Sequence, residues 1–248
     1  MLRPNLARFD KATRIATSLV RDLDRAIAVR EMFERSALKR GVASKFNNTY
    51  QAWGYNVIES ALLTDLIVTL MRIHDTDERS ASMPNLIKLL ADPSVIAAMK
   101  ENARRWVLER DVHHLTPIDD EILRIVGDMR QRRAADEAAA IERIARRALR
   151  RAAKFETDAM RASLQKYRNK HIAHNAMVES TFGVKYGYPG KLLDRTALIG
   201  YELVLAVTGT HIDFRETRAA WRKKGDDFWK HAVLPFKVRK TSKRPRRP

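Results

Sequence analysis

The apolar positions of this chain recur at the three- and four-residue spacing of an α-helix, and no run alternates apolar and polar residues as a half-exposed strand does. The segment from Thr49 to about His74 shows the pattern well. Its predicted buried side consists of Leu62, Leu66, Ile67, Leu70 and Ile73. Gly and Pro, which interrupt helices, number only nine and eight in 248 residues. The sequence therefore predicts an all-α fold, arranged as an antiparallel helical bundle.

A series of helical segments is expected. They run from Asn5 to about Arg40 (one helix or two), Thr49 to about His74, Pro84 to Leu90, Pro93 to about Arg110, Thr116 to about residue 170, Asp194 to about Thr208 and Phe214 to Lys230. Asp92 and Thr116 each precede a Pro, which is the order of an N-cap followed by the first helical position. These two sites are the clearest predicted helix starts.

Four interruptions of the helical pattern are expected. They are a stop at Gly41, a polar turn over residues 75–80, a possible break near Gly127 and a loop over residues 180–190. The apolar run from Leu203 to Val207 is short enough to fit either a helix or a strand. Both assignments stay open for that run.

The length of the chain fits one large or two small domains, and we expect a single helical domain over residues 1–236 with a basic tail over 237–248, disordered when unbound. The absence of Cys excludes disulfides and thiolate metal sites and favours a cytoplasmic location. No signal peptide is visible at the start. The best membrane candidate, Ala61 to Met71, is about half a span long and contains Asp65, so no membrane partner is expected.

The charge of the chain is strongly positive and unevenly distributed. Lys and Arg number 48 against 30 Asp and Glu, which gives a net charge of +18. The segment from Lys237 to Pro248 holds seven basic residues and no acidic one, which leaves +11 for the remainder. Residues 130–170 carry +8 of that remainder. Such a balance predicts a polyanionic partner, nucleic acid above all.

Six basic residues are predicted to share one face of a helix just before residue 160. They are Arg143, Arg146, Arg147, Arg150, Arg151 and Lys154. Because this face has almost no acids at i,i+4 spacing, its cations repel one another unless an anion binds. We expect the stripe, together with Lys170, to contact a nucleic-acid backbone. The alternative is an ordinary solvated helix face.

The most informative short motif is the run from Arg168 to His174. An Arg binds phosphate through its planar fork, and a His exchanges a proton near neutral pH. On a regular helix, Arg168 and His174 lie about 120° apart and border an apolar-leaning stripe, whereas Asn169 points to roughly the opposite side. The stripe consists of Met160, Leu164, Tyr167 and His171. A border of this kind is typical of a cleft or a subunit interface.

This motif, Arg-Asn-Lys-His-Ile-Ala-His over residues 168–174, resembles the signature of the HEPN superfamily of helical nucleotide-binding proteins and ribonucleases. That signature is an Arg with a polar neighbour, followed four to six residues later by a His. The apolar segment over residues 65–75, with the Leu-rich segment over 82–90, resembles the AbiU-type abortive-infection branch. The resemblance is strongest over residues 43–190.

The resemblance implies a metal-independent, cofactor-free endoribonuclease that acts as a toxin or phage-defence effector. In such proteins, two protomers pair their motifs across one composite site, and the ribose 2′-hydroxyl attacks the adjacent phosphate of RNA. Carried over to this chain, Arg168, Asn169 and His174 are the catalytic candidates, with His171 and Tyr167 as accessory ones. A homodimer is expected, and an antitoxin or defence partner is possible.

Two alternative functions remain. The chain could bind nucleic acid through its stripe and tail without cleaving it, or it could be a helical module that binds a partner nuclease or an antitoxin. A metal site is disfavoured, because His171 and His174 have no carboxylate or third His nearby in the sequence to complete the ligand set.

Overall fold

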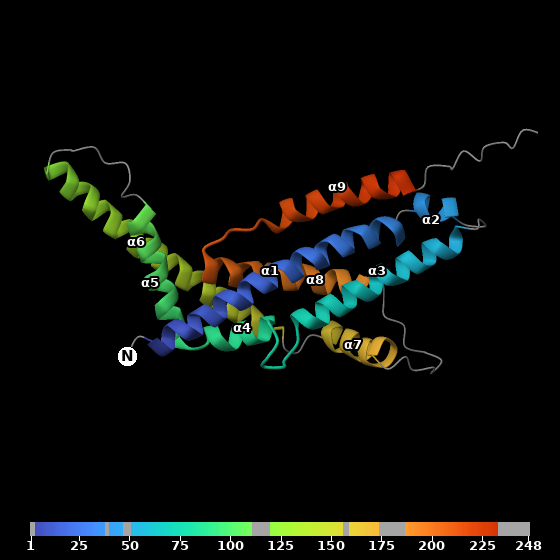
Figure 1. The fold of residues 1–248 in the computed structure, drawn as a ribbon, viewed down its shortest axis with the longest axis horizontal. Coiled ribbons are helices and arrows are strands. Elements are labelled where there is room, and N and C mark those ends of the chain that lie inside the picture. The colour runs from blue at the N-terminus through green and yellow to red at the C-terminus, as the bar shows by residue number, and fades with distance from the viewer. Residues whose placement is uncertain are drawn as a thin grey trace, which may run out of the picture.

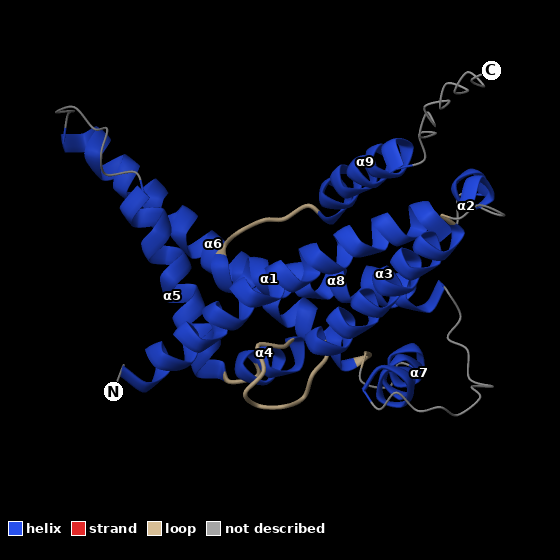
Figure 2. Ribbon diagram, turned by 45° about the vertical axis from the view of Figure 1, so that its right-hand side comes forward, coloured by secondary structure: helices blue, strands red, loops and turns tan. Residues whose placement is uncertain are grey.

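The computed structural model describes residues 3–37, 40–46, 51–110, 120–155, 159–173 and 187–232. Within these ranges every regular element is a helix, which confirms the predicted all-α fold (Figure 2). The helices are α1 (Arg3–Ala37), α2 (Arg40–Phe46), α3 (Ala52–Ile73), α4 (Met83–Leu90), α5 (Pro93–Arg110), α6 (Asp120–Ala153), α7 (Ala159–Tyr167), the π-helical turn η2 (Arg168–Ala173), α8 (Gly187–Thr208) and α9 (Phe214–Ala232). The run from Leu203 to Val207 is therefore helical.

Helix α1 is the centre of the bundle. It packs against α3, α8 and α9 along its length and against α4 and α5 near its start. Its fully buried side chains recur at three- and four-residue spacing, which is the signature of an apolar helix face. They include Ala12, Ala16, Leu19, Leu23, Ala26 and Ile27. These side chains form one core cluster with residues of α3 to α8.

The long helices alternate in direction, as expected for an antiparallel bundle (Figure 1). Helix α3 runs back along α1. After the turn at Gly209, which adopts a positive φ of 70°, α9 reverses the direction of α8 and packs on α1. Helices α5 and α6 pair as a hairpin that projects from the bundle, and the second half of α6 returns to pack on α8. None of the described helices has the length and apolar character needed to cross a membrane.

Several predicted helix boundaries are confirmed. Helix α3 ends at Ile73 with Leu66, Ile67, Leu70 and Ile73 buried, as the apolar pattern predicts. Helix α5 begins at Pro93, and Asp92 accepts a hydrogen bond from the N–H of Ser94 at 2.9 Å. Hydrogen bonds from Ser94 hold the pKa of Asp92 below its usual value. The Thr116 cap and the tail 237–248 lie outside the described residues.

Other boundaries differ from the prediction. Gly41 lies inside α2 rather than ending a helix, and α6 continues through Gly127. The continuous helix of α6 stops at Ala153, and just beyond it Phe155 is buried and stacks on His74 with the ring centroids 5.4 Å apart. That contact joins residues 81 positions apart in sequence, so local patterns do not reveal it.

The predicted loop over residues 180–190 also extends too far, because α8 already begins at Gly187. Gly187 to Gly190 form the first turn of α8. Pro189 is tolerated there because the first N–H groups of a helix have no intrahelical acceptor. Gly190 lies close to α1, and a Cβ at this position would come within 3.1 Å of Glu34. Residues 180–186 lie outside the described residues.

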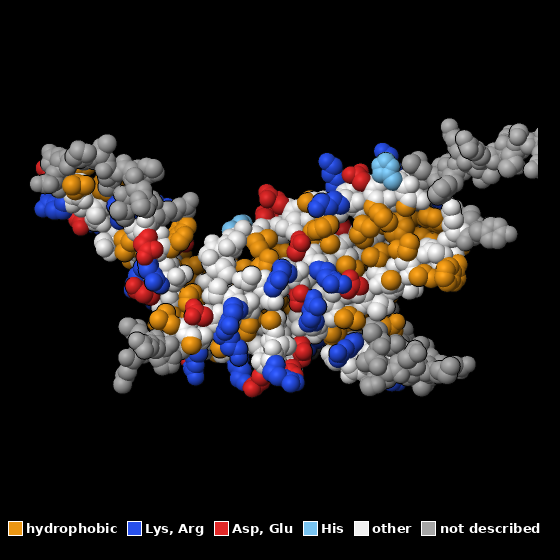
Figure 3. Space-filling model, viewed as in Figure 1, with side chains coloured by type: hydrophobic (Ala, Val, Ile, Leu, Met, Phe, Trp, Pro, Cys, Tyr) orange, Lys and Arg blue, Asp and Glu red, His pale blue; other side chains and the backbone are white. Residues whose placement is uncertain are grey.

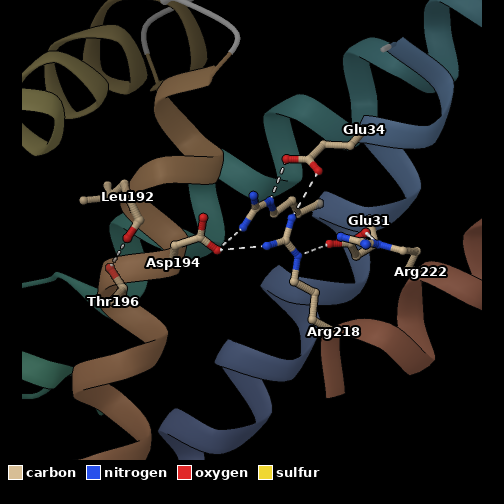
Figure 4. A network of polar contacts seen from close by, with 8 residues as sticks. Glu31, Glu34, Leu192, Asp194, Thr196, Arg218 and Arg222 are labelled. Carbon is tan, nitrogen blue, oxygen red and sulfur yellow. Dashed lines mark hydrogen bonds and ion pairs between the residues drawn. The ribbon is translucent and has the colours of Figure 1, made fainter. Parts of the chain in front are cut away.

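A buried ion network fixes α9 and α8 to α1 (Figure 4). The carboxylate of Glu31 is 1% exposed and accepts hydrogen bonds from Arg218 at 2.5 Å and Arg222 at 3.3 Å. Arg30, which is also buried, pairs with Asp194 of α8. Because a buried charge without partners is costly, these groups hold one another in a single arrangement.

This network gives a test of how α9 is attached. Glu31→Gln keeps the size of the side chain but leaves two guanidinium groups without their buried carboxylate. We expect the free energy of unfolding to fall by about 1–3 kcal/mol, measured by urea denaturation with tryptophan fluorescence, since Trp221 and Trp229 both lie on α9. The matched control, Glu137→Gln, changes an exposed carboxylate on α6 and should unfold like the wild type. Equal stabilities of the two variants would contradict the role of Glu31.

Candidate active site

An open groove of about 930 Å³ lies between the end of α3 and the segment formed by α7 and η2. The α3 side contributes Val68, Met71, Arg72, His74, Asp75 and Thr76, and the other side contributes Ala159, Arg161, Ala162, Gln165, Lys166, Arg168, Asn169 and Lys170. Three consecutive residues of the sequence motif, 168–170, therefore line this groove. The two sides come from segments about a hundred residues apart in the chain.

Helix α7 is held against the bundle by its apolar side, as the sequence predicts. Leu164 is fully buried, and Tyr167 is half-buried and packs on the core. Helix α7 contacts both α8 and α3. Beyond Tyr167 the chain winds into the π-helical turn, and Arg168, Asn169 and Lys170 are all exposed. Turns of this kind are uncommon and are often found at functional sites.

The wider turn brings Asn169 beside Arg168. The Oδ1 of Asn169 accepts hydrogen bonds from Nη1 of Arg168 at 3.2 Å and from Nε2 of Gln165 at 3.1 Å. The expectation that Asn169 points away from the motif surface is therefore wrong, because it assumed regular α-helical geometry. Asn169 engages one terminal nitrogen of Arg168. No described residue bonds to Nε or Nη2, the pair that forms bidentate bonds to a phosphate.

The groove is rich in positive charge. Its described lining residues include five cations, Arg72, Arg161, Lys166, Arg168 and Lys170, against one carboxylate, Asp75. Arg72 pairs with Asp22 of α1. Within the described ranges, neither Arg161, Arg168 nor Lys170 pairs with a carboxylate. Unneutralised cations around a concave surface attract and hold anions.

The two histidines of the motif have no described side chains. His174 lies outside the described residues, and the described part of His171 is its backbone, within η2. The position of His174 relative to Arg168 therefore stays a prediction. In the part of the chain that the structure describes, no three His, Asp or Glu side chains are grouped so that they could hold a metal ion.

A buried histidine forms the floor of the groove at the end of α3. His74 is 5% exposed, and its Nε2 lies 2.8 Å from the hydroxyl of Thr196. That hydroxyl donates its proton to the carbonyl of Leu192 at 2.8 Å (Figure 4). It therefore accepts a hydrogen bond from His74. Nε2 of His74 therefore carries a proton, and the ring is oriented by Thr196 on one edge and Phe155 on its face.

Sequence reasoning missed most of the groove outside the motif. Arg161 and Gln165 precede Arg168 by seven and three residues on α7, so helical periodicity alone places them on the same side. That signal was available. No such signal reveals the contribution of Arg72 and Thr76 to the groove, because it depends on the packing of α3 beside α7.

The predicted basic stripe on α6 is exposed along its whole length, as expected. Acids at i,i+4 spacing are few on this face, as the sequence indicates, but tertiary packing supplies a further acidic partner. Arg147 and Arg151 bind Glu202 of α8 at 3.0 and 2.5 Å. Arg146 binds Glu142 at 2.7 Å, and hydrogen bonds from Lys100 and then Arg146 hold the pKa of Glu142 below its usual value. Glu202 lies 51 positions beyond Arg151, so this pairing is a tertiary contact.

The row of basic residues along the middle of the stripe, as seen around the helix axis, has no such partners among the described residues. Arg143, Arg150 and Lys154 are exposed, and no carboxylate of the described residues pairs with them. Their separations of seven and four residues place them within about 40° of one another around the helix. The flanking arginines are paired with carboxylates, two of them sharing Glu202, whereas this central row has no described carboxylate partner and is available to an anion.

Comparison with known proteins identifies the family. A family model described as AbiU2, of the HEPN class, matches residues 9–228. The match extends well beyond the 43–190 range in which the motifs lie, and it includes α1, α8 and most of α9. No curated protein and no solved structure is significantly similar to the chain. With most of its length matched, the chain belongs to the AbiU2 family of HEPN proteins.

Proposed function

We propose that this protein is a metal-independent endoribonuclease of the HEPN type that acts as a toxin or phage-defence effector. The observation that carries the proposal is the exposed Arg168, bonded to Asn169 inside a cation-lined groove. An HEPN protein of the AbiU2 family with this arrangement has the parts needed to hold a phosphodiester. The family match supports a nuclease module associated with abortive infection.

In the proposed reaction, Arg168 binds the scissile phosphate through Nε and Nη2, and Asn169 holds the guanidinium in place. The ribose 2′-hydroxyl loses its proton to a base and attacks the phosphorus, and the leaving 5′-oxygen receives a proton from an acid. The products are a 2′,3′-cyclic phosphate and a 5′-hydroxyl. Arg168 stabilises the extra negative charge on the phosphate in the transition state.

His174 is the proposed base or acid, and a second copy of the chain supplies the other group. One motif offers a single candidate for two proton transfers, whereas a two-fold dimer offers two His174 and two Arg168. The dimer also explains why the motif lies at an open groove rather than in a closed pocket, since the second copy completes the wall.

One face of α3 suits such a pairing. From Trp53 to Val68 its exposed positions at three- and four-residue spacing carry no charge, and they are Trp53, Val57, Ser60, Ala61, Thr64 and Val68. The next position, Arg72, pairs with Asp22. Trp53 is 77% exposed, and Val68 at the other end also lines the motif groove. Hydrophobic side chains gather where α2, the start of α3 and the end of α9 meet, while Lys and Arg spread over the middle (Figure 3). Two chains of charge +18 can approach closely on an uncharged face.

The first prediction concerns the chemistry. RNA cleavage should persist in EDTA and leave 2′,3′-cyclic phosphate ends, because proton transfer and charge stabilisation come from side chains. Arg168→Ala and His174→Ala should each lower the cleavage rate by about 10²-fold or more. Arg124→Ala removes an equal charge from an exposed site on the α5–α6 hairpin and should keep full activity. RNA binding without cleavage by the wild type would instead identify a non-catalytic binding module.

The second prediction concerns assembly. Ala61→Arg should convert the dimer to monomer at micromolar concentration and reduce cleavage, because a two-fold interface places each new cation near its copy. Light scattering measures the change. Ala135→Arg, an exposed position on α6, is the matched control and should remain dimeric. A wild-type monomer that cleaves RNA at full rate would contradict the composite site.

The third prediction separates the two parts of the basic stripe. Changing both Arg143 and Arg150 to Gln should flatten the log–log salt dependence of RNA binding by about 1.4, at roughly 0.7 per single-strand phosphate contact. Changing both Arg147 and Arg151 to Gln removes as much charge but should flatten the salt dependence less, because both side chains are already engaged by Glu202. Equal slopes for wild type and the first variant would mean that the RNA path avoids this face.

A further inference from the structure

We propose that a second pocket, next to the motif groove, receives one base of the bound RNA and gives the enzyme a preference for the base near the cleaved bond. This inference rests on the proposed ribonuclease function and adds a base subsite to it. The pocket has a volume of about 580 Å³ and lies between α4, the end of α6 and the start of α7. It shares His74, Thr76 and Arg161 with the groove, so the two form one continuous depression.

The walls of the pocket are mostly apolar, and the two charged residues Glu78 and Lys88 that also line it pair with each other. Met83, Pro84 and Ile87 of α4 line one side. The other side consists of Leu149, Ala152, Ala153 and Phe155. A phosphate or a ribose gains little from such walls, whereas the flat faces of a base are apolar and pack well against them. Sequence-selective proteins commonly read single-stranded RNA by taking an unstacked base out of the strand.

Polar groups at the rim suit the edge of a base. The amide nitrogen of Asn85 donates to the backbone carbonyls of Asp77 at 2.6 Å and Ser80 at 2.8 Å. These bonds fix the direction of Asn85, and its Oδ1 accepts no hydrogen bond from the described residues. An acceptor held in this way selects for bases that present an amino or imino group. The hydroxyl of Thr76 is exposed at the junction and can donate or accept.

Arg161 stands where the two cavities join, seven residues before Arg168 on the same side of α7. No carboxylate of the described residues neutralises it. It is therefore in position to hold the backbone phosphate between the base in the pocket and the phosphate on Arg168. On the opposite side, Ala153 follows Arg150 of the basic stripe by three residues, so the stripe leads along α6 to the pocket.

Ala153 offers a way to fill the pocket without disturbing the core, because it lines the pocket and is exposed. Ala153→Trp should block the pocket. Ala135→Trp places the same side chain on an exposed site of α6, roughly 27 Å away along the helix axis, and is the matched control. Circular dichroism and the melting temperature check that both variants fold.

The experiment maps cleavage sites on a mixed-sequence RNA for the wild type and both variants. The wild type should favour one or two bases at a fixed position beside the cut, by about tenfold. Ala153→Trp should lose most of this preference, and Ala135→Trp should retain it. The same loss should appear in fluorescence anisotropy with short uncleavable 2′-deoxy oligonucleotides that differ only in that base, which keeps the test independent of catalytic rate.

The outcomes separate this inference from the proposed function. Cleavage by the wild type with no base preference, or a preference that survives Ala153→Trp in both assays, overturns the base subsite and leaves the ribonuclease intact. If the wild type neither cleaves nor binds RNA, both proposals fail. Loss of preference in Ala153→Trp alone supports the subsite.

Discussion

The burial of α1 against α3 and α8 is the constraint on which the rest of the structure depends. Leu19, Leu23 and Ile27 are fully buried, and they hold the two helices that carry the functional surfaces. Helix α3 then presents the uncharged face from Trp53 to Val68 to solvent and ends at the motif groove. Helix α8 packs against α6 and α7. The ion network around Glu31 adds α9 to this arrangement. The groove is thus positioned by a core that contains neither Arg168 nor Asn169.

The site combines a buried anchor with exposed polar side chains. Leu164 anchors α7, and the π-helical turn immediately after it exposes Arg168 and Asn169 next to each other. His74, oriented by Thr196, closes the floor of the groove from α3. Groups held in this way lose little freedom when a phosphate binds, which is the condition for stabilising a transition state by preorganised charge. The flanking arginines of the basic stripe are engaged by Glu142 and Glu202, which leaves one row without a described carboxylate partner, the row that leads toward the pocket.

Much of the fold was predictable from the sequence, because helical periodicity and caps are local signals. The buried side of α3 and the start of α5 at Pro93 are examples. The end of α6 before α7 was not predictable, since the stacking of Phe155 on His74 beside it joins residues far apart in the sequence. The motif itself was visible in the sequence, but its geometry changed because the chain winds into a wider turn at Arg168. The pairing of the basic stripe with Glu202 likewise required the packing of α6 on α8.

The central claim is that the groove between α3 and α7 holds the scissile phosphate. A crystal structure of the protein with an RNA that carries a single 2′-deoxyribose at the cleaved position tests it most directly, since the strand binds but lacks the attacking hydroxyl. The account predicts a backbone phosphate within hydrogen-bonding distance of Nε and Nη2 of Arg168, with the motif of a second copy facing it. RNA bound elsewhere, with no phosphate at Arg168, would contradict the account.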